Sequence, residues 1–62
     1  MDYFAIFEGL RLINVVEIDR EKPNELLRLI ETYAIAYEGI NCKMIDQETY
    51  LILKGALING LN

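Results

Sequence analysis

The sequence contains no histidine, no serine and a single cysteine, Cys42. Without histidine or serine, the chain cannot build a Ser–His or Cys–His nucleophile system. One cysteine cannot close an intramolecular disulfide, and a zinc site would need carboxylates around one thiolate, which is an unusual ligand set. The glycines are widely spaced and form no phosphate-binding loop. We therefore expect a protein that is not an enzyme and has no cofactor and no bound metal.

Long apolar runs and an excess of basic charge are also missing. The longest uninterrupted apolar runs, such as residues 3–7, are far too short to span a membrane, and Met1 is followed by Asp2 rather than by a basic leader region. Ten carboxylates outnumber six Lys and Arg, for a net charge of −4, so there is no basic stripe to bind phosphates. We expect a cytoplasmic protein that binds neither nucleic acid directly nor a membrane.

What the chain has is an excess of apolar residues for its size. Its 62 residues make a single small domain, 1–62, and 53% of them are apolar, against about 45–50% in ordinary globular domains. A core this small needs further support, which disulfides and metals do not supply here. The sequence therefore predicts a homo-oligomer, with a dimer favoured.

The most regular apolar spacing lies in residues 26–44. Side chains there recur at steps of four and three, the spacing with which one helix lays a seam against another. Pro23 suits the first turn of such a helix, so we expect a helix over 23–44. Gly39 leaves an alternative, in which the helix ends and 40–45 is a connector or strand. The seam, which is our predicted interface, consists of Leu26, Ile30, Tyr33, Tyr37, Ile40 and Met44.

Residues 2–18 allow two interpretations. As a helix, 2–18 would begin at Asp2 and be apolar nearly all round, as a helix enclosed by neighbours is. As strands, 3–7 and 10–18 would form a hairpin around Glu8 and Gly9, and the β-branched residues would suit a sheet. Glu-Gly is not a strong turn signal, so we favour the helix.

A third helix is predicted over residues 46–60. Asp46 is a good N-cap, and Ile45 and Tyr50 have the spacing of a hydrophobic staple. Gly60 would end the helix, and Leu61 would extend its apolar stripe. Because the connection to the second helix is short, the two should pack as an antiparallel helical hairpin. The predicted fold is all-α, a three-helix protein completed by oligomerisation. The alternative is an α+β fold with an N-terminal β-hairpin packed on a 24–38 helix.

For function, the acidic charge and the tyrosines are the informative features. Tyr33 and Tyr37 suit an interface, where tyrosine is enriched. We expect a small regulatory protein, such as an antirepressor or inhibitor, that docks on a basic partner surface. The alternative is a purely structural homo-oligomerisation module. The acidic docking face would consist of Glu25, Glu31, Glu38, Asp46 and Glu48.

Overall fold

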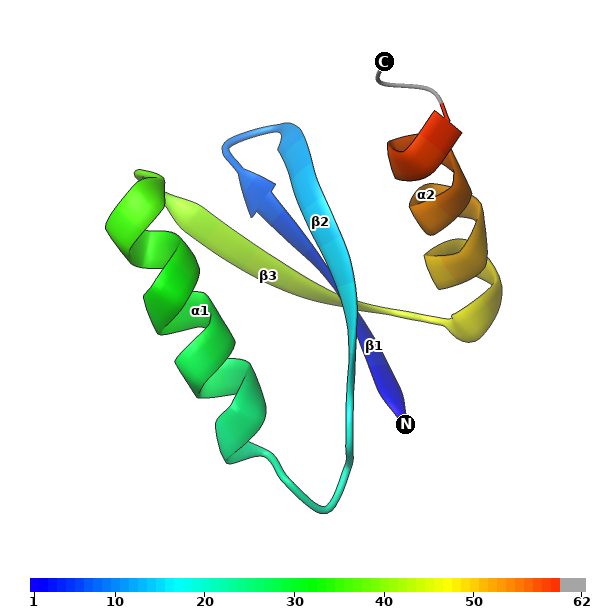
Figure 1. Cartoon of the computed structure of the whole chain (residues 1–62), viewed down its shortest axis with the longest axis horizontal. Helices are drawn as coiled ribbons and strands as arrows, with labels where there is room; N and C mark the ends of the chain where they lie inside the picture. Colours follow the sequence, from blue (N-terminus) through cyan, green and yellow to red (C-terminus); the bar gives the residue numbers. More distant parts are fainter. Residues whose placement is uncertain (60–62) are drawn as a thin grey trace.

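The computed structural model of the chain describes residues 1–59 and shows an α+β fold, so the all-α prediction is wrong and its stated alternative is right. Three strands form one antiparallel sheet in the order β2-β1-β3. Two helices accompany the sheet (Figure 1). The elements are β1 (Asp2–Glu8), β2 (Arg11–Ile18), α1 (Asn24–Ala36), β3 (Ile40–Ile45) and α2 (Gln47–Asn59).

The N-terminal helix predicted over 2–18 is replaced by the β1–β2 hairpin. Its two-residue turn is Gly9-Leu10, one residue later than the turn considered above, and Gly9 has φ +61°. Hairpin turns of this length require positive φ, which glycine adopts without steric cost. A bulge between Ile6 and Phe7 leaves Ile13 as the extra residue on β2. The β-branched residues that seemed to line every side of a helix lie on the two faces of a sheet.

The second predicted helix is also corrected, because α1 ends at Ala36 rather than near residue 44. Tyr37 is already extended, and Gly39 has φ +65°, which turns the chain into β3. β3 then pairs with β1, from Tyr3 opposite Ile45 to Glu8 opposite Ile40. The regularly spaced apolar residues of 26–44 therefore lie partly on α1 and partly on β3, and do not form one helical seam.

The third predicted helix is present as α2, after the N-cap Asp46, which accepts a hydrogen bond of 2.7 Å from the backbone N–H of Thr49. The predicted helical hairpin is wrong, because β3 separates the two helices and they lie on opposite faces of the sheet (Figure 1). Gly60 and Leu61, our predicted helix end and last stripe residue, lie outside the described residues.

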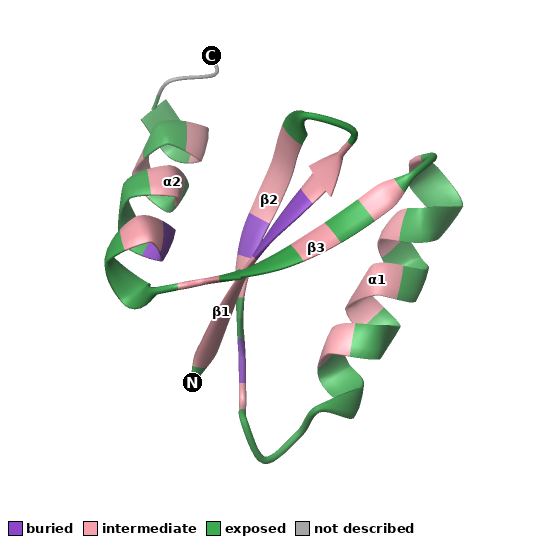
Figure 2. Ribbon diagram, turned by 180° about the vertical axis from the view of Figure 1, so that it is seen from behind, coloured by how far each residue is buried: buried purple, intermediate pink, exposed green. Residues whose placement is uncertain are grey.

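The core is small and lies mainly between the sheet and α2. Ala5, Val15 and Tyr50 form its buried centre. The partly buried side chains packed against this centre are Tyr3, Phe7, Leu12, Ile45, Leu53 and Leu57. On the opposite face Ile6 is fully buried, but α1 has no buried residue among its thirteen (Figure 2).

The molecule is flat, and its flat sides are the two edges of the sheet. Its Cα atoms extend over 30 × 26 × 15 Å. In the view down the shortest axis, the strands lie one behind another with a helix on each side (Figure 1), and the view from behind brings β3 forward (Figure 2). Each edge strand is therefore reached from a broad surface bordered by both helices.

Candidate functional site

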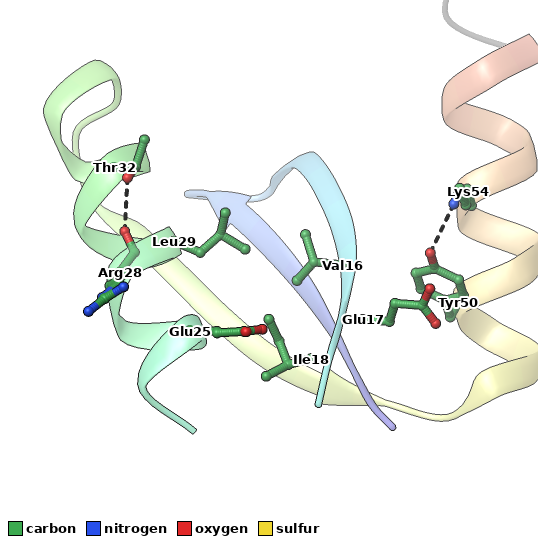
Figure 3. A pocket seen from close by; sticks show the side chains of 9 residues that line it. All are labelled: Val16, Glu17, Ile18, Glu25, Arg28, Leu29, Thr32, Tyr50 and Lys54. Atoms are coloured by element: carbon green, nitrogen blue, oxygen red, sulfur yellow. Dashed lines mark hydrogen bonds between the residues drawn. The ribbon is translucent and has the colours of Figure 1, made fainter. Parts of the chain in front are cut away.

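The edge of β2 is one of the two unpaired edges of the sheet among the described residues. Beyond the β2 edge, which pairs only with β1, lie two hollows of about 590 and 440 Å³. In the larger one Val16 and Ile18 of β2 lie between Leu29 of α1 and Tyr50 of α2 (Figure 3). The smaller one is lined at the hairpin end of the strand by Arg11, Leu12, Ile13, Tyr37, Ala56 and Leu57. We call the surface formed by β2 and these hollows the β2 groove.

A side chain blocks the backbone of β2 halfway along this edge. The Oδ1 of Asn14 accepts a hydrogen bond of 2.9 Å from the backbone N–H of Val15. Its Nδ2 donates a bond of 2.8 Å to the hydroxyl of Tyr33 on α1. On an edge strand of an antiparallel sheet, alternate residues direct their N–H and C=O away from the neighbouring strand. We infer that Val15 is one of these residues, because its N–H is bonded to a side chain.

One side of α2 next to the larger hollow is exposed. Lys54 lines this hollow with Glu17, and Leu51 and Ile58 lie about one turn before and after Lys54 on the same side of the helix, outside both hollows. The side chains of Leu51 and Ile58 are 59% and 61% exposed. The Lys54 ammonium donates a hydrogen bond of 3.0 Å to the Tyr50 hydroxyl, and this bond, with a smaller effect from the charge of Glu17, raises the pKa of Lys54. Lys54 therefore stays charged beside the groove.

The charges around the larger hollow are balanced. Glu17 and Glu25 are acidic, and Arg28 and Lys54 are basic. In this hollow the acidic residues come from β2 and α1, and the basic residues come from α1 and α2 (Figure 3). A surface with equal numbers of both charges can face a copy of itself without net repulsion.

The predicted interface residues lie on two elements and the turn between them. Leu26, Ile30 and Tyr33 are half-buried on α1, which covers the sheet. Tyr37 follows α1 and stacks near Tyr33, with ring centroids 6.1 Å apart. The remaining two, Ile40 and Met44, are in β3, where Ile40 is half-buried and Met44 is exposed.

The predicted acidic docking residues also come from several elements. Glu25 and Glu31 are on α1, and Glu38 is in the turn before β3. Asp46 and Glu48 are at the start of α2, on the other side of the sheet. Hydrogen bonds with Thr49 lower the pKa of Asp46, which caps this helix. The structure thus brings these residues to both sides of the sheet.

Sequence reasoning did not single out Asn14, Leu51 or Ile58. Their roles depend on which edge of the sheet is free and on which side of α2 faces the sheet. The one available signal was the spacing of Leu51, Lys54 and Ile58, which runs parallel to the predicted stripe through Tyr50, Leu53 and Leu57. That spacing cannot show whether the second stripe is covered.

Other sites are not supported by the geometry. Within residues 1–59, no three His, Cys, Asp or Glu side chains gather closely enough to hold a metal ion. Burial raises the pKa of the Cys42 thiol, which lowers its reactivity. Neither α1 nor α2 has the length and apolarity of a membrane-spanning helix. Comparison with protein-family models, curated proteins and solved structures finds no match to this chain.

Proposed function

We propose that this chain is a structural homo-oligomerisation module whose basic unit is a dimer. One observation carries the proposal: within residues 1–59, only five apolar side chains are buried. Eight large apolar side chains are exposed, namely Met1, Leu10, Leu27, Ile35, Met44, Leu51, Ile52 and Ile58. Leu51, Ile52 and Ile58 are gathered on α2, and exposed apolar residues that lie together are typical of a protein that covers them with a partner.

The small core supports the same proposal. A domain of about 60 residues is marginal when its own core is its only source of stability. Association of two copies stabilises the folded state by mass action, because only the folded chain binds its partner. A dimer would therefore supply the support that disulfides and metals supply in other small domains.

Sedimentation equilibrium at micromolar concentration tests the proposal directly. We expect a dimer that dissociates on dilution, together with a Tm that rises with protein concentration. A monodisperse monomer whose Tm does not change with concentration contradicts the proposal. Circular dichroism at each concentration controls for loss of the fold.

A second candidate is the small regulatory protein that docks through its carboxylates on a basic partner. In its favour, the salt bridge formed by described residues is Arg20 with Asp2, at 2.9 Å, so none of the five predicted docking carboxylates is paired with a basic side chain there. Replacing Glu31 and Glu38 with lysine tests it. Capture of the partner from the native host should fail for this variant and succeed for the unmodified chain. Retained capture would remove the main support for docking.

A further inference from the structure

We propose that the second copy binds along the β2 groove, where the two β2 strands pair antiparallel across a two-fold axis. The product is a continuous six-stranded sheet in the order β3-β1-β2-β2-β1-β3, with two helices on each face. This inference rests on the proposed homo-oligomerisation and adds the surface and geometry of the contact. The occupant of the groove is thus a second copy of this chain.

The backbone of β2 is the better of the two edges for strand pairing. Residues 12–16 carry no charge and are mostly branched apolar residues, which favour a paired strand. β3 is shorter and has Lys43 in its middle, and a lysine on an edge strand opposes pairing. Pairing at β2 also supplies a backbone acceptor for the outward N–H of Val15.

An interface of standard size on the flat side has to cover most of that side. The Cα atoms of the chain fit within a rectangle of 30 by 26 Å, or about 780 Å². Stable complexes of standard size bury roughly 800 Å² on each partner. Two copies stacked on this side bring the hollows above each β2 strand together and fill them with the partner's side chains.

The two helices are compatible with a two-fold axis perpendicular to the sheet. Such an axis places both copies of α1 on one face of the six-stranded sheet and both copies of α2 on the other, with the two copies of each helix antiparallel. The exposed Leu51 of one α2 then lies toward the Ile58 end of the other. Because the two β2 strands are antiparallel, the larger hollow of one copy lies across from the smaller hollow of the other, and Glu25 and Arg28 of one α1 lie toward the Tyr37 end of its copy.

In the free chain, the Asn14 side chain blocks strand pairing at this edge. Its amide oxygen accepts a hydrogen bond from the backbone N–H of Val15, and its amide nitrogen donates one to the Tyr33 hydroxyl. A pairing strand replaces the Asn14 oxygen with a backbone carbonyl, which requires only a rotation of one side chain. This block limits pairing with the edge strands of other proteins. Those strands do not bring the contacts between helices that a second copy supplies, so they gain less from displacing the Asn14 side chain.

The first test compares two exposed helix residues by sedimentation equilibrium. Ala56→Glu places a charge in the smaller hollow, which Ala56 lines, and we expect the dimer Kd to rise about a hundredfold, because the two-fold axis repeats the change. Leu27→Glu is the control, since Leu27 is 59% exposed and lies on the opposite side of α1 from Glu25 and Leu29, which line the larger hollow. Its Kd should change less than threefold. Equal Kd values for Ala56→Glu and the unmodified chain overturn the proposed surface.

The second test removes single backbone donors, which total synthesis of a 62-residue chain permits. N-methylation of Val15 blocks the outward donor of β2 and should abolish the dimer. In β3 the corresponding outward residue is Met44, because Ala5 directs its backbone groups toward Lys43 rather than toward Val15. N-methyl-Met44 is therefore the control and should dimerise normally. Circular dichroism confirms that both chains fold.

The outcomes separate this inference from the proposed function. If the unmodified chain is a monomer, both fail. If it is a dimer that survives Ala56→Glu and N-methyl-Val15, homo-oligomerisation stands and the β2 groove is excluded. If N-methyl-Met44 alone abolishes the dimer, the contact is at β3 and the inference is wrong.

Discussion

Asn14 of β2 and Tyr33 of α1 are joined by a hydrogen bond of 2.8 Å from the amide Nδ2 to the phenolic oxygen. The bond spans nineteen positions of the chain and fixes the amide so that its oxygen meets the N–H of Val15. One side-chain pair therefore joins α1 to the sheet and closes the free edge of β2.

Replacing Asn14 with alanine should have opposite effects on the monomer and the dimer. The dilute chain loses two part-buried hydrogen bonds, so its free energy of unfolding should fall by about 1–2 kcal/mol. The dimer Kd should fall, because no side chain must be displaced from the edge. Chemical denaturation below the Kd and sedimentation measure the two effects. Tyr33→Phe keeps the Asn14 amide but removes the bond that fixes it, so its Kd should fall less than that of Asn14→Ala. A weaker dimer would show that Asn14 contributes to the interface instead.

Two glycines should respond to alanine in opposite ways. Gly39 has φ +65°, a region that costs an L-residue roughly 1–2 kcal/mol, so Gly39→Ala should destabilise the chain by about that amount. Gly55 lies inside α2 with nothing within 4 Å of an added Cβ, so Gly55→Ala should stabilise it by about 0.5–1 kcal/mol. Urea denaturation of both variants at one concentration provides the measurement. Stabilisation by Gly39→Ala would mean that the chain does not turn into β3 there.

The cap formed by Asp46 predicts a pH dependence. Because hydrogen bonds with Thr49 lower the pKa of Asp46 in the folded chain, the carboxylate stabilises the fold above its unfolded pKa of about 3.9. This contribution is lost as the pH falls through the lower folded pKa. Asp46→Asn keeps a capping oxygen but cannot titrate, so its Tm should fall less steeply below pH 4. Parallel Tm curves for the two chains would exclude the cap as the cause.

Tyr50 should be the most sensitive position of the core. It is 5% exposed, and its ring centroid lies 4.8 Å from that of Tyr3. Removing a large buried aromatic costs about 3–5 kcal/mol, whereas a 62-residue chain has a total stability of roughly 3–9 kcal/mol. Tyr50→Ala should therefore lose its cooperative thermal transition. Tyr50→Phe keeps the ring and loses the bond from Lys54, so it should retain the transition at a slightly lower Tm.

Local signals in the sequence were sufficient for α2 and for the start of α1. Asp46, Pro23 and the polar residues around them act on their own neighbours, so their effect can be read without the rest of the chain. The excess of apolar residues also showed that a small core would leave apolar surface exposed. These features depend on composition and short spacing alone.

Only the tertiary structure decided whether residues 2–18 and 40–45 form helices or strands. Both segments are apolar enough for a helix or a strand, and β1 decides between these structures by pairing with a neighbour on each side. The same pairing leaves β2 and β3 at the edges and places Lys54 beside the residues of one of them. Hydrogen bonds between strands join residues far apart in the sequence, so a local spacing rule does not contain them.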